Sequence, residues 1–159
     1  MPHLVALAGG FEISDDPARL DMATIHRFIS EESYWARGRD RATVERALAH
    51  SLCFGIYGPD GAQVGFARLV TDRTTAAHLS DVYVLAAYRG RGLSKALMAA
   101  ILGHPELRTI ARWTLSTDDA HGLYAGFGFA AHPEVSSQMW RLKRPDEACK
   151  CDVANSSSG

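Results

Sequence analysis

The sequence has few cysteines and no long apolar run, and each shortage excludes a class of protein. Its three cysteines are odd in number, and Cys53 falls in an apolar run, so a disulfide framework is not expected. Cys149 and Cys151 lie in a polar segment without further metal ligands, and we expect no metal site there. Because no apolar stretch is long enough for a bilayer and no basic region precedes the short one near residue 4, we expect a cytoplasmic protein without a membrane partner.

The chain also lacks an excess of charge of either sign. It has 17 lysines and arginines against 18 aspartates and glutamates, a formal net charge of −1. A protein that coats nucleic acid needs a basic surface, so no nucleic-acid partner is expected. The 159 residues, 47% of them hydrophobic, suffice for one core but not for two. We therefore predict a single domain over residues 1–145 and a polar tail over 146–159.

Alternation, helical spacing and turn residues predict a series of short elements. A Pro-Asp-Gly turn at 59–61 lies between two apolar runs and predicts a hairpin, because proline fixes φ and glycine accepts positive φ. Asp15 or Asp16 should cap a helix that begins at Pro17, and Asp40 should cap the next. The expected order is strand 11–16, helix 17–30, loop 31–39, helix 41–50, strands 51–58, 62–72 and 76–86, helix 93–102, strand 109–117, helix 118–128 and strand 135–144.

This order predicts the fold class. Three strands that follow one another through short turns pair in antiparallel fashion, whereas two strands joined by a helix become parallel neighbours. The chain should therefore be an α/β (α+β) protein with a mixed, mostly antiparallel sheet. The crossover begins at residues 89–92, where two arginines alternate with two glycines.

The segment 89–92 stands at the expected start of a helix, where backbone N–H groups without partners attract anions. Gly90 and Gly92 would let a ligand approach those groups, and Arg89 and Arg91 add positive charge. A phosphate or pyrophosphate is the expected occupant. The alternative is a tight turn with solvated arginines, and the segment has neither the Gly-Lys-Ser/Thr ending of a nucleotide P-loop nor the third glycine of a dinucleotide fingerprint.

The pattern Arg89-x-x-Gly92-x-Ser94, after an apolar strand and at the start of an amphipathic helix, resembles the acyl-CoA pyrophosphate loop of the GNAT N-acetyltransferase family. That family has Gly or Ala where this chain has Ser94. The stretch 115–129, with Ala-x-x-Leu-Tyr and a closing Gly-Phe, is similar to the second signature of the family. The resemblance covers roughly residues 11–144. It implies a splayed parallel strand pair, about four helices around the sheet, and transfer of an acetyl group from acetyl-CoA, without a metal, to an amine of a small molecule or peptide.

The resemblance also implies roles for individual residues. Tyr124 holds the family position of the acid that protonates the thiolate of CoA; the alternative is a half-buried aromatic in the core. A backbone N–H near Val84 would face the thioester carbonyl. The family often has Asn where this chain has Thr117. The implied contacts of acetyl-CoA are Val82, Tyr83, Val84, Arg89, Gly90, Arg91, Gly92, Leu93, Ser94, Lys95 and Thr117.

The proton acceptor is left open by the sequence. Asp81 precedes the loop on the same strand and lies where many family members carry a carboxylate, so it could act as general base. It could equally bind a backbone amide or attract a cationic substrate. His78 and His121 are reserve candidates.

The polar segment around Tyr34 and Trp35 is the expected substrate wall, although Trp35 could instead pack the loop onto the sheet. Arg37 and Arg39 in the same segment would favour a carboxylate-bearing acceptor. Glu31 and Glu32 would favour an amine. A non-catalytic module of the same fold that binds CoA or another anion is the alternative function. Pairing of two chains through the last expected strand, which carries Met139 and Trp140, would give a homodimer.

Overall fold

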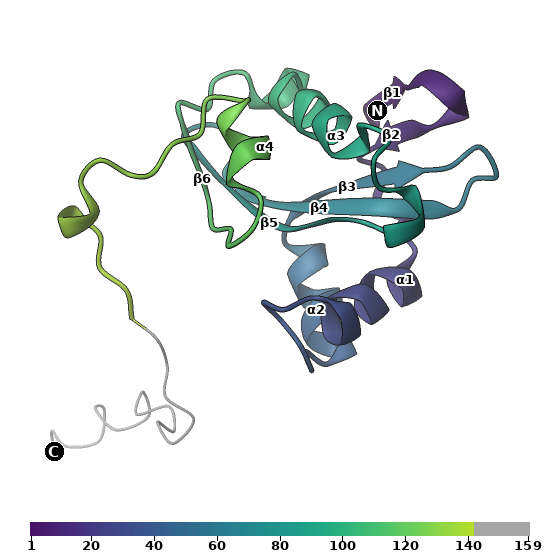
Figure 1. Cartoon of the computed structure of the whole chain (residues 1–159), viewed down its shortest axis with the longest axis horizontal. Coiled ribbons are helices and arrows are strands. Elements are labelled where there is room, and N and C mark those ends of the chain that lie inside the picture. The colour runs from purple at the N-terminus through teal and green to yellow at the C-terminus, as the bar shows by residue number, and fades with distance from the viewer. Residues whose placement is uncertain (142–159) are drawn as a thin grey trace, which may run out of the picture. The chain divides into compact units, whose positions relative to one another are not determined.

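The computed structural model describes residues 1–141, in two compact units that divide after Gly128. Within the described residues, the first unit contains one six-stranded sheet and four α-helices (Figure 1). None of the helices described is both long and apolar enough to cross a bilayer. The strands are β1 (Leu4–Ala6), β2 (Glu12–Ser14), β3 (Leu52–Tyr57), β4 (Gln63–Thr71), β5 (Ala76–Val84) and β6 (Arg112–Leu115), and the helices are α1 (Met22–Arg27), α2 (Arg41–Ala49), α3 (Leu93–Leu102) and α4 (His121–Ala125).

The strands lie in the order in which they occur along the chain, from β1 to β6. Each neighbouring pair from β1 to β5 is antiparallel, and β5 and β6 are parallel. Helix α3 makes the crossover between β5 and β6 on one face of the sheet, and α1 and α2 cover the other face (Figure 1). The structure thus confirms the predicted α/β fold with its mixed, mostly antiparallel sheet.

The hairpin of β3 and β4 forms where the turn residues predict it. Gly58 and Ala62 are joined by a backbone hydrogen bond of 2.9 Å, and Gly61 has a φ of 82°, which a residue with a side chain rarely adopts. Asp40 caps α2 as expected, accepting a hydrogen bond from the backbone N–H of Thr43 at 2.9 Å.

The first helix begins later than predicted. Asp16 caps only a short 3-10 turn at Pro17–Arg19, and α1 starts at Met22, where Asp21 accepts a hydrogen bond of 3.0 Å from Thr24 N–H. The backbone N–H of Asp21 is itself bound to the side chain of Gln63 in β4, at 2.7 Å. This contact with a strand far along the chain fixes where the helix begins.

A hydrophobic core lies between the sheet and the helices α1 and α2. Phe28, just after α1, stacks on Tyr83 of β5 with ring centroids 3.8 Å apart, and Phe66 of β4 lies beside them. Burial of these large aromatic rings contributes much of the apolar area of the core. The core therefore holds the end of β5 in place from the α1 and α2 side.

The predicted last strand is wrong within the described residues. Residues Val135–Ser137 form a 3-10 turn, in which both the backbone N–H and the hydroxyl of Ser137 donate to the carbonyl of Glu134. Such local hydrogen bonds compete with a strand ladder. Met139 and Trp140 are exposed and lie outside any strand. Residues 142–144 and the predicted tail, including Cys149 and Cys151, lie outside the described residues, so the proposed tail stays a prediction.

One strand was not predicted. The short apolar run Leu4–Ala6 forms β1 and pairs with β2, Val5 lying opposite Ile13. Gly9 and Gly10, both with positive φ, turn the chain between the two strands. The two glycines are the signal that could have identified this hairpin.

Candidate active site

The parallel strands β5 and β6 separate after a short paired stretch. Their register runs from Ala76, opposite Arg112, to Leu79, opposite Leu115, and β6 ends there while β5 continues to Val84. On its other edge β5 remains paired with β4 as far as Val84. The backbone of β5 beyond Leu79 thus faces an opening rather than a strand of the described sheet.

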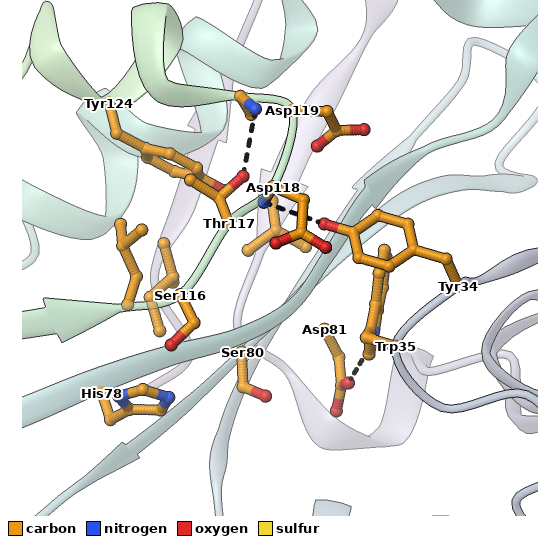
Figure 2. Close-up of a pocket in the computed structure, with 14 residues that line it drawn as sticks. Tyr34, Trp35, His78, Ser80, Asp81, Ser116, Thr117, Asp118, Asp119 and Tyr124 are labelled. Atoms are coloured by element: carbon orange, nitrogen blue, oxygen red, sulfur yellow. Dashed lines mark hydrogen bonds between the residues drawn. The ribbon is translucent and has the colours of Figure 1, made fainter.

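A pocket of about 300 Å³ lies in this opening. Figure 2 shows His78, Ser80 and Asp81 of β5 along one wall, and Tyr124 of α4 with Thr117 on the facing wall. Its remaining lining residues are Tyr34, Trp35, Leu79, Val82, Leu115, Ser116, Asp118, Asp119 and Ala120.

The aromatic pair Tyr34 and Trp35 closes one side of the pocket and connects its two walls (Figure 2). The indole N–H of Trp35 donates to Asp81 Oδ1 at 2.9 Å, and the hydroxyl oxygen of Tyr34 accepts from the backbone N–H of Asp118 at 3.2 Å. The two rings meet edge to face, 5.0 Å apart. Trp35 also contacts Phe28 of the core, so it packs the loop onto the sheet as well as lining the pocket, and its contact with a substrate stays a prediction.

Asp81 is buried in a network of donors. Its side chain is 2% exposed, Arg68 Nε donates to Oδ2 at 2.6 Å, and Arg39 Nη1 lies 3.6 Å from Oδ1. The backbone at Asp81 has a φ of 51°, at a site where the register with β4 shifts around Phe66 and Arg68. Both carboxylate oxygens are engaged by protein groups, which favours the non-base role that the sequence left open for Asp81.

Arg37 does not take part in this network. It is exposed and is not among the residues that line the pocket, whereas Arg39 reaches Asp81. Sequence reasoning had no means of ranking the two arginines, because they flank a single glycine in a loop without periodicity. His121, one of the reserve candidates, is also exposed and lies outside the pocket lining.

Tyr124 is buried in the pocket wall opposite β5 (Figure 2). Burial of the phenol raises the pKa of Tyr124, and the nearby Asp119 and Tyr34 act in the same direction. The hydroxyl group therefore keeps its proton at neutral pH. Thr117 accepts a hydrogen bond from Ala120 N–H at 3.0 Å and so shapes the turn that leads into α4.

The glycine-arginine segment forms an open turn before α3. Gly90 and Gly92 each have a φ of 76°, and an added Cβ at either position would meet nothing within 4 Å. No side chain caps α3, which begins at Leu93. Arg89 Nε donates to the carbonyl of Val84 at 3.0 Å, which fastens the turn to the end of β5.

The three predicted ligands on β5 differ in orientation. Val82 lines the pocket, Tyr83 is buried in the core against Phe28, and Val84 is buried with its carbonyl bound to Arg89. Sequence reasoning missed seven of the lining residues, namely Leu79, Ser80, Leu115, Ser116, Asp118, Asp119 and Ala120. For Ser80, the alternation along β5 that groups it with His78 was the available signal.

Comparison with known proteins places these features in a wider context. A family model described as acetyltransferase (GNAT) domain matches residues 49–131. A protein of Gibberella zeae named as an acetyltransferase is 33% identical, with the match covering 71% of this chain and 75% of the relative. A crystal structure from Xanthomonas campestris pv. campestris, described as an acetyltransferase of the GNAT family, is 46% identical, has a TM-score of 0.80, and matches 90% of this chain and 95% of its own. Glucosamine-6-phosphate N-acetyltransferase from Arabidopsis thaliana shares the fold at 13% identity, with a TM-score of 0.56 over 92% of this chain and 99% of its own.

Proposed function

Because the chain belongs to the GNAT acetyltransferase family, we propose that it transfers the acetyl group of acetyl-CoA to an amine of a small molecule or peptide, by direct attack in a ternary complex. The observation that supports this most strongly is the separation of β5 from β6 after Leu79, which opens a pocket with a protonated phenol, Tyr124, in its wall. A thioester, an amine and a proton donor could meet there.

The residues at this opening fit the donor. On the side away from β4, the backbone of β5 from Ser80 to Tyr83 faces no strand of the described sheet, so it could pair with the amide groups of the pantetheine arm as a further strand would. The carbonyl of Val84 is already bound to Arg89. The open turn at Gly90 and Gly92 leaves the first N–H groups of α3 accessible, where a pyrophosphate would be stabilised by the helix dipole. Arg89 and Arg91 supply positive charge at the same turn.

We expect replacement of Arg89 with alanine to weaken acetyl-CoA binding roughly tenfold or more, because a charge-assisted hydrogen bond is lost. Calorimetric titration of the wild type and the variant with acetyl-CoA measures this. Arg46→Ala, an exposed arginine in the last turn of α2, is the matched control and should bind like the wild type. An unchanged dissociation constant in Arg89→Ala would contradict the assignment of the turn to the pyrophosphate.

In the proposed reaction, different protein groups have different roles. A backbone N–H on the open edge of β5, near Val84, would stabilise the negative charge that develops on the thioester oxygen. Tyr124 would give its proton to the departing thiolate of CoA. Tyr34 and Trp35 would bound the space in which the acceptor amine lies.

We expect Trp35→Phe to raise the KM for the acceptor roughly two- to tenfold without changing acetyl-CoA affinity, because the ring remains but loses its bond to Asp81. Initial rates with a panel of spermidine, L-lysine and benzylamine measure the change. Trp113→Phe is the control, since the indole of Trp113 also makes a single hydrogen bond, to Ile110, outside the pocket lining. An acceptor KM that stays at the wild-type value would exclude Trp35 from the acceptor site.

The test of the function itself is turnover. Release of CoA thiol from acetyl-CoA, dependent on one of these amines and accompanied by the acetylated amine in mass spectra, is the expected result. Acetyl-CoA binding without any turnover would instead favour the alternative, a binding module of the same fold.

A further inference from the structure

We propose, on the basis of the proposed function, that Nε2 of His78 accepts the proton that the acceptor ammonium must lose before its nitrogen attacks. His78 lies in the pocket wall on β5, at the last but one residue pair before β5 and β6 separate. It stands across the pocket from Tyr124 (Figure 2). A proton acceptor and a proton donor would thus face the same space from opposite walls.

The proposal requires that Nε2 of His78 be the ring nitrogen without a hydrogen. Nδ1 lies 2.8 Å from the hydroxyl oxygen of Thr114, its partner on β6. The hydroxyl of Thr114 donates its one proton to the carbonyl of Ala77, in a long contact of 3.5 Å. The 2.8 Å contact by itself fits either tautomer; in the proposal the hydroxyl proton stays directed at Ala77, and the oxygen of Thr114 accepts from Nδ1–H. In this tautomer Nε2 carries a lone pair and no hydrogen.

The surroundings keep the imidazole neutral. His78 is exposed overall, but partial burial of its ring, followed by the positive charge of Arg68 on β4, lowers the pKa of His78 below its usual 6.5. The residue opposite His78 on β4 is the apolar Val70, and that on β6 is the neutral Thr114. The charged groups in the pocket lining itself are the carboxylates Asp81, Asp118 and Asp119. At pH 7 the ring is therefore mostly unprotonated and can accept a proton.

Asp81, the other group considered for this task, is poorly placed by comparison. Its carboxylate is held by Trp35, Arg68 and Arg39 and is almost fully buried. Arg68 also donates a hydrogen bond to the hydroxyl of Ser80, at 3.0 Å, so the same network fixes the pocket wall beside His78. Asp81 and Arg68 are thus positioning residues.

The proton balance of the reaction is complete with these groups. An ammonium acceptor gives one proton to Nε2 of His78, and the nitrogen lone pair forms the N–C bond while the C–S bond breaks. Tyr124 gives its proton to the leaving sulfur and regains one from the nitrogen that has become an amide. His78 then returns its proton to solvent, so the products are the acetylated amine, CoA thiol and one proton.

The first experiment is ¹⁵N NMR of the ligand-free protein with labelled histidine, the His78 signals being identified by their loss in His78→Gln. At pH 7 we expect the neutral tautomer with hydrogen on Nδ1. Thr114→Val should remove this preference, because the acceptor for Nδ1–H is gone. A hydrogen on Nε2, or a charged ring at pH 7, would overturn the proposal whatever the enzyme activity is.

The second experiment is the pH dependence of kcat/KM with acetyl-CoA and the best amine of the panel. We expect His78→Gln to lower kcat by at least about 10²-fold and to remove an acidic limb with its midpoint below pH 6.5, with acetyl-CoA affinity kept. Imidazole in solution should partly restore His78→Ala. His50→Gln, an exposed histidine after α2, is the control and should keep the wild-type profile.

The outcomes separate the two proposals. Wild-type turnover with an unaltered profile in His78→Gln would overturn the role of His78 and leave the acetyltransferase function standing. Absence of amine-dependent turnover in the wild type would overturn the function, and with it the role of His78.

Discussion

Replacing Tyr124 with phenylalanine is expected to lower kcat by roughly 10²- to 10⁴-fold, the usual contribution of a positioned acid or base. The variant removes one oxygen from a buried ring in the pocket wall, so the affinity for acetyl-CoA should stay close to that of the wild type. Steady-state rates with the best amine of the panel, combined with calorimetric titration, separate the two quantities.

The control for this variant is Tyr57→Phe. The hydroxyl of Tyr57 is also buried, but it lies in β3, has no hydrogen-bond partner in the described structure and is absent from the pocket lining. Its removal should leave kcat unchanged. Full activity in Tyr124→Phe would remove the phenol from the mechanism and leave solvent as the proton donor to sulfur.

The second large effect concerns stability. Asp81→Ala should lower the free energy of unfolding by about 3–5 kcal/mol, because it leaves the guanidinium of Arg68, only 14% exposed, without its counter-charge. Urea denaturation followed by circular dichroism measures the change. Glu45→Ala breaks the ion pair with Arg41 on the surface of α2 and serves as control, with an expected loss below about 1 kcal/mol. Equal losses of unfolding free energy in the two variants would mean that the buried ion pair of Asp81 with Arg68 contributes no more to stability than a surface pair.

The parts of the fold that the sequence predicts correctly depend on residues close together in the chain. The turn at Gly61 and the cap at Asp40 each involve neighbours within four residues, so the local pattern contains the whole interaction. The start of α1 depends on Gln63, 42 residues beyond Asp21, and no local pattern can contain that contact. The serines around residue 137 show the converse case, where local bonds prevail over an apolar pattern typical of a strand.

In the candidate site, too, the features set by neighbouring residues could be predicted, and those set by distant residues could not. The segment from Arg89 to Ser94 and the position of Tyr124 could be identified from motifs, since each motif is continuous in the sequence. The partners of Asp81 could not be identified in this way. Trp35, 46 residues away, reaches Asp81 because the loop after α1 folds over β5, and Arg68, 13 residues away, reaches it because β4 pairs with β5 in a register that no local motif specifies. The tautomer of His78 likewise depends on Thr114, 36 residues later.

The link formed by Tyr34 and Trp35 has a consequence for protein engineering. One of these side chains is fastened to β5 through Asp81, and the other to the backbone at Asp118 beyond β6. A loop transplanted from another acetyltransferase to redirect substrate choice would break both attachments and leave Asp81 with one donor fewer. A loop chosen for such an exchange should therefore keep Trp35 as the donor to Asp81 and Tyr34 as the acceptor for the backbone N–H of residue 118. Libraries that vary the rest of the loop should retain more folded members than libraries that also vary these two residues.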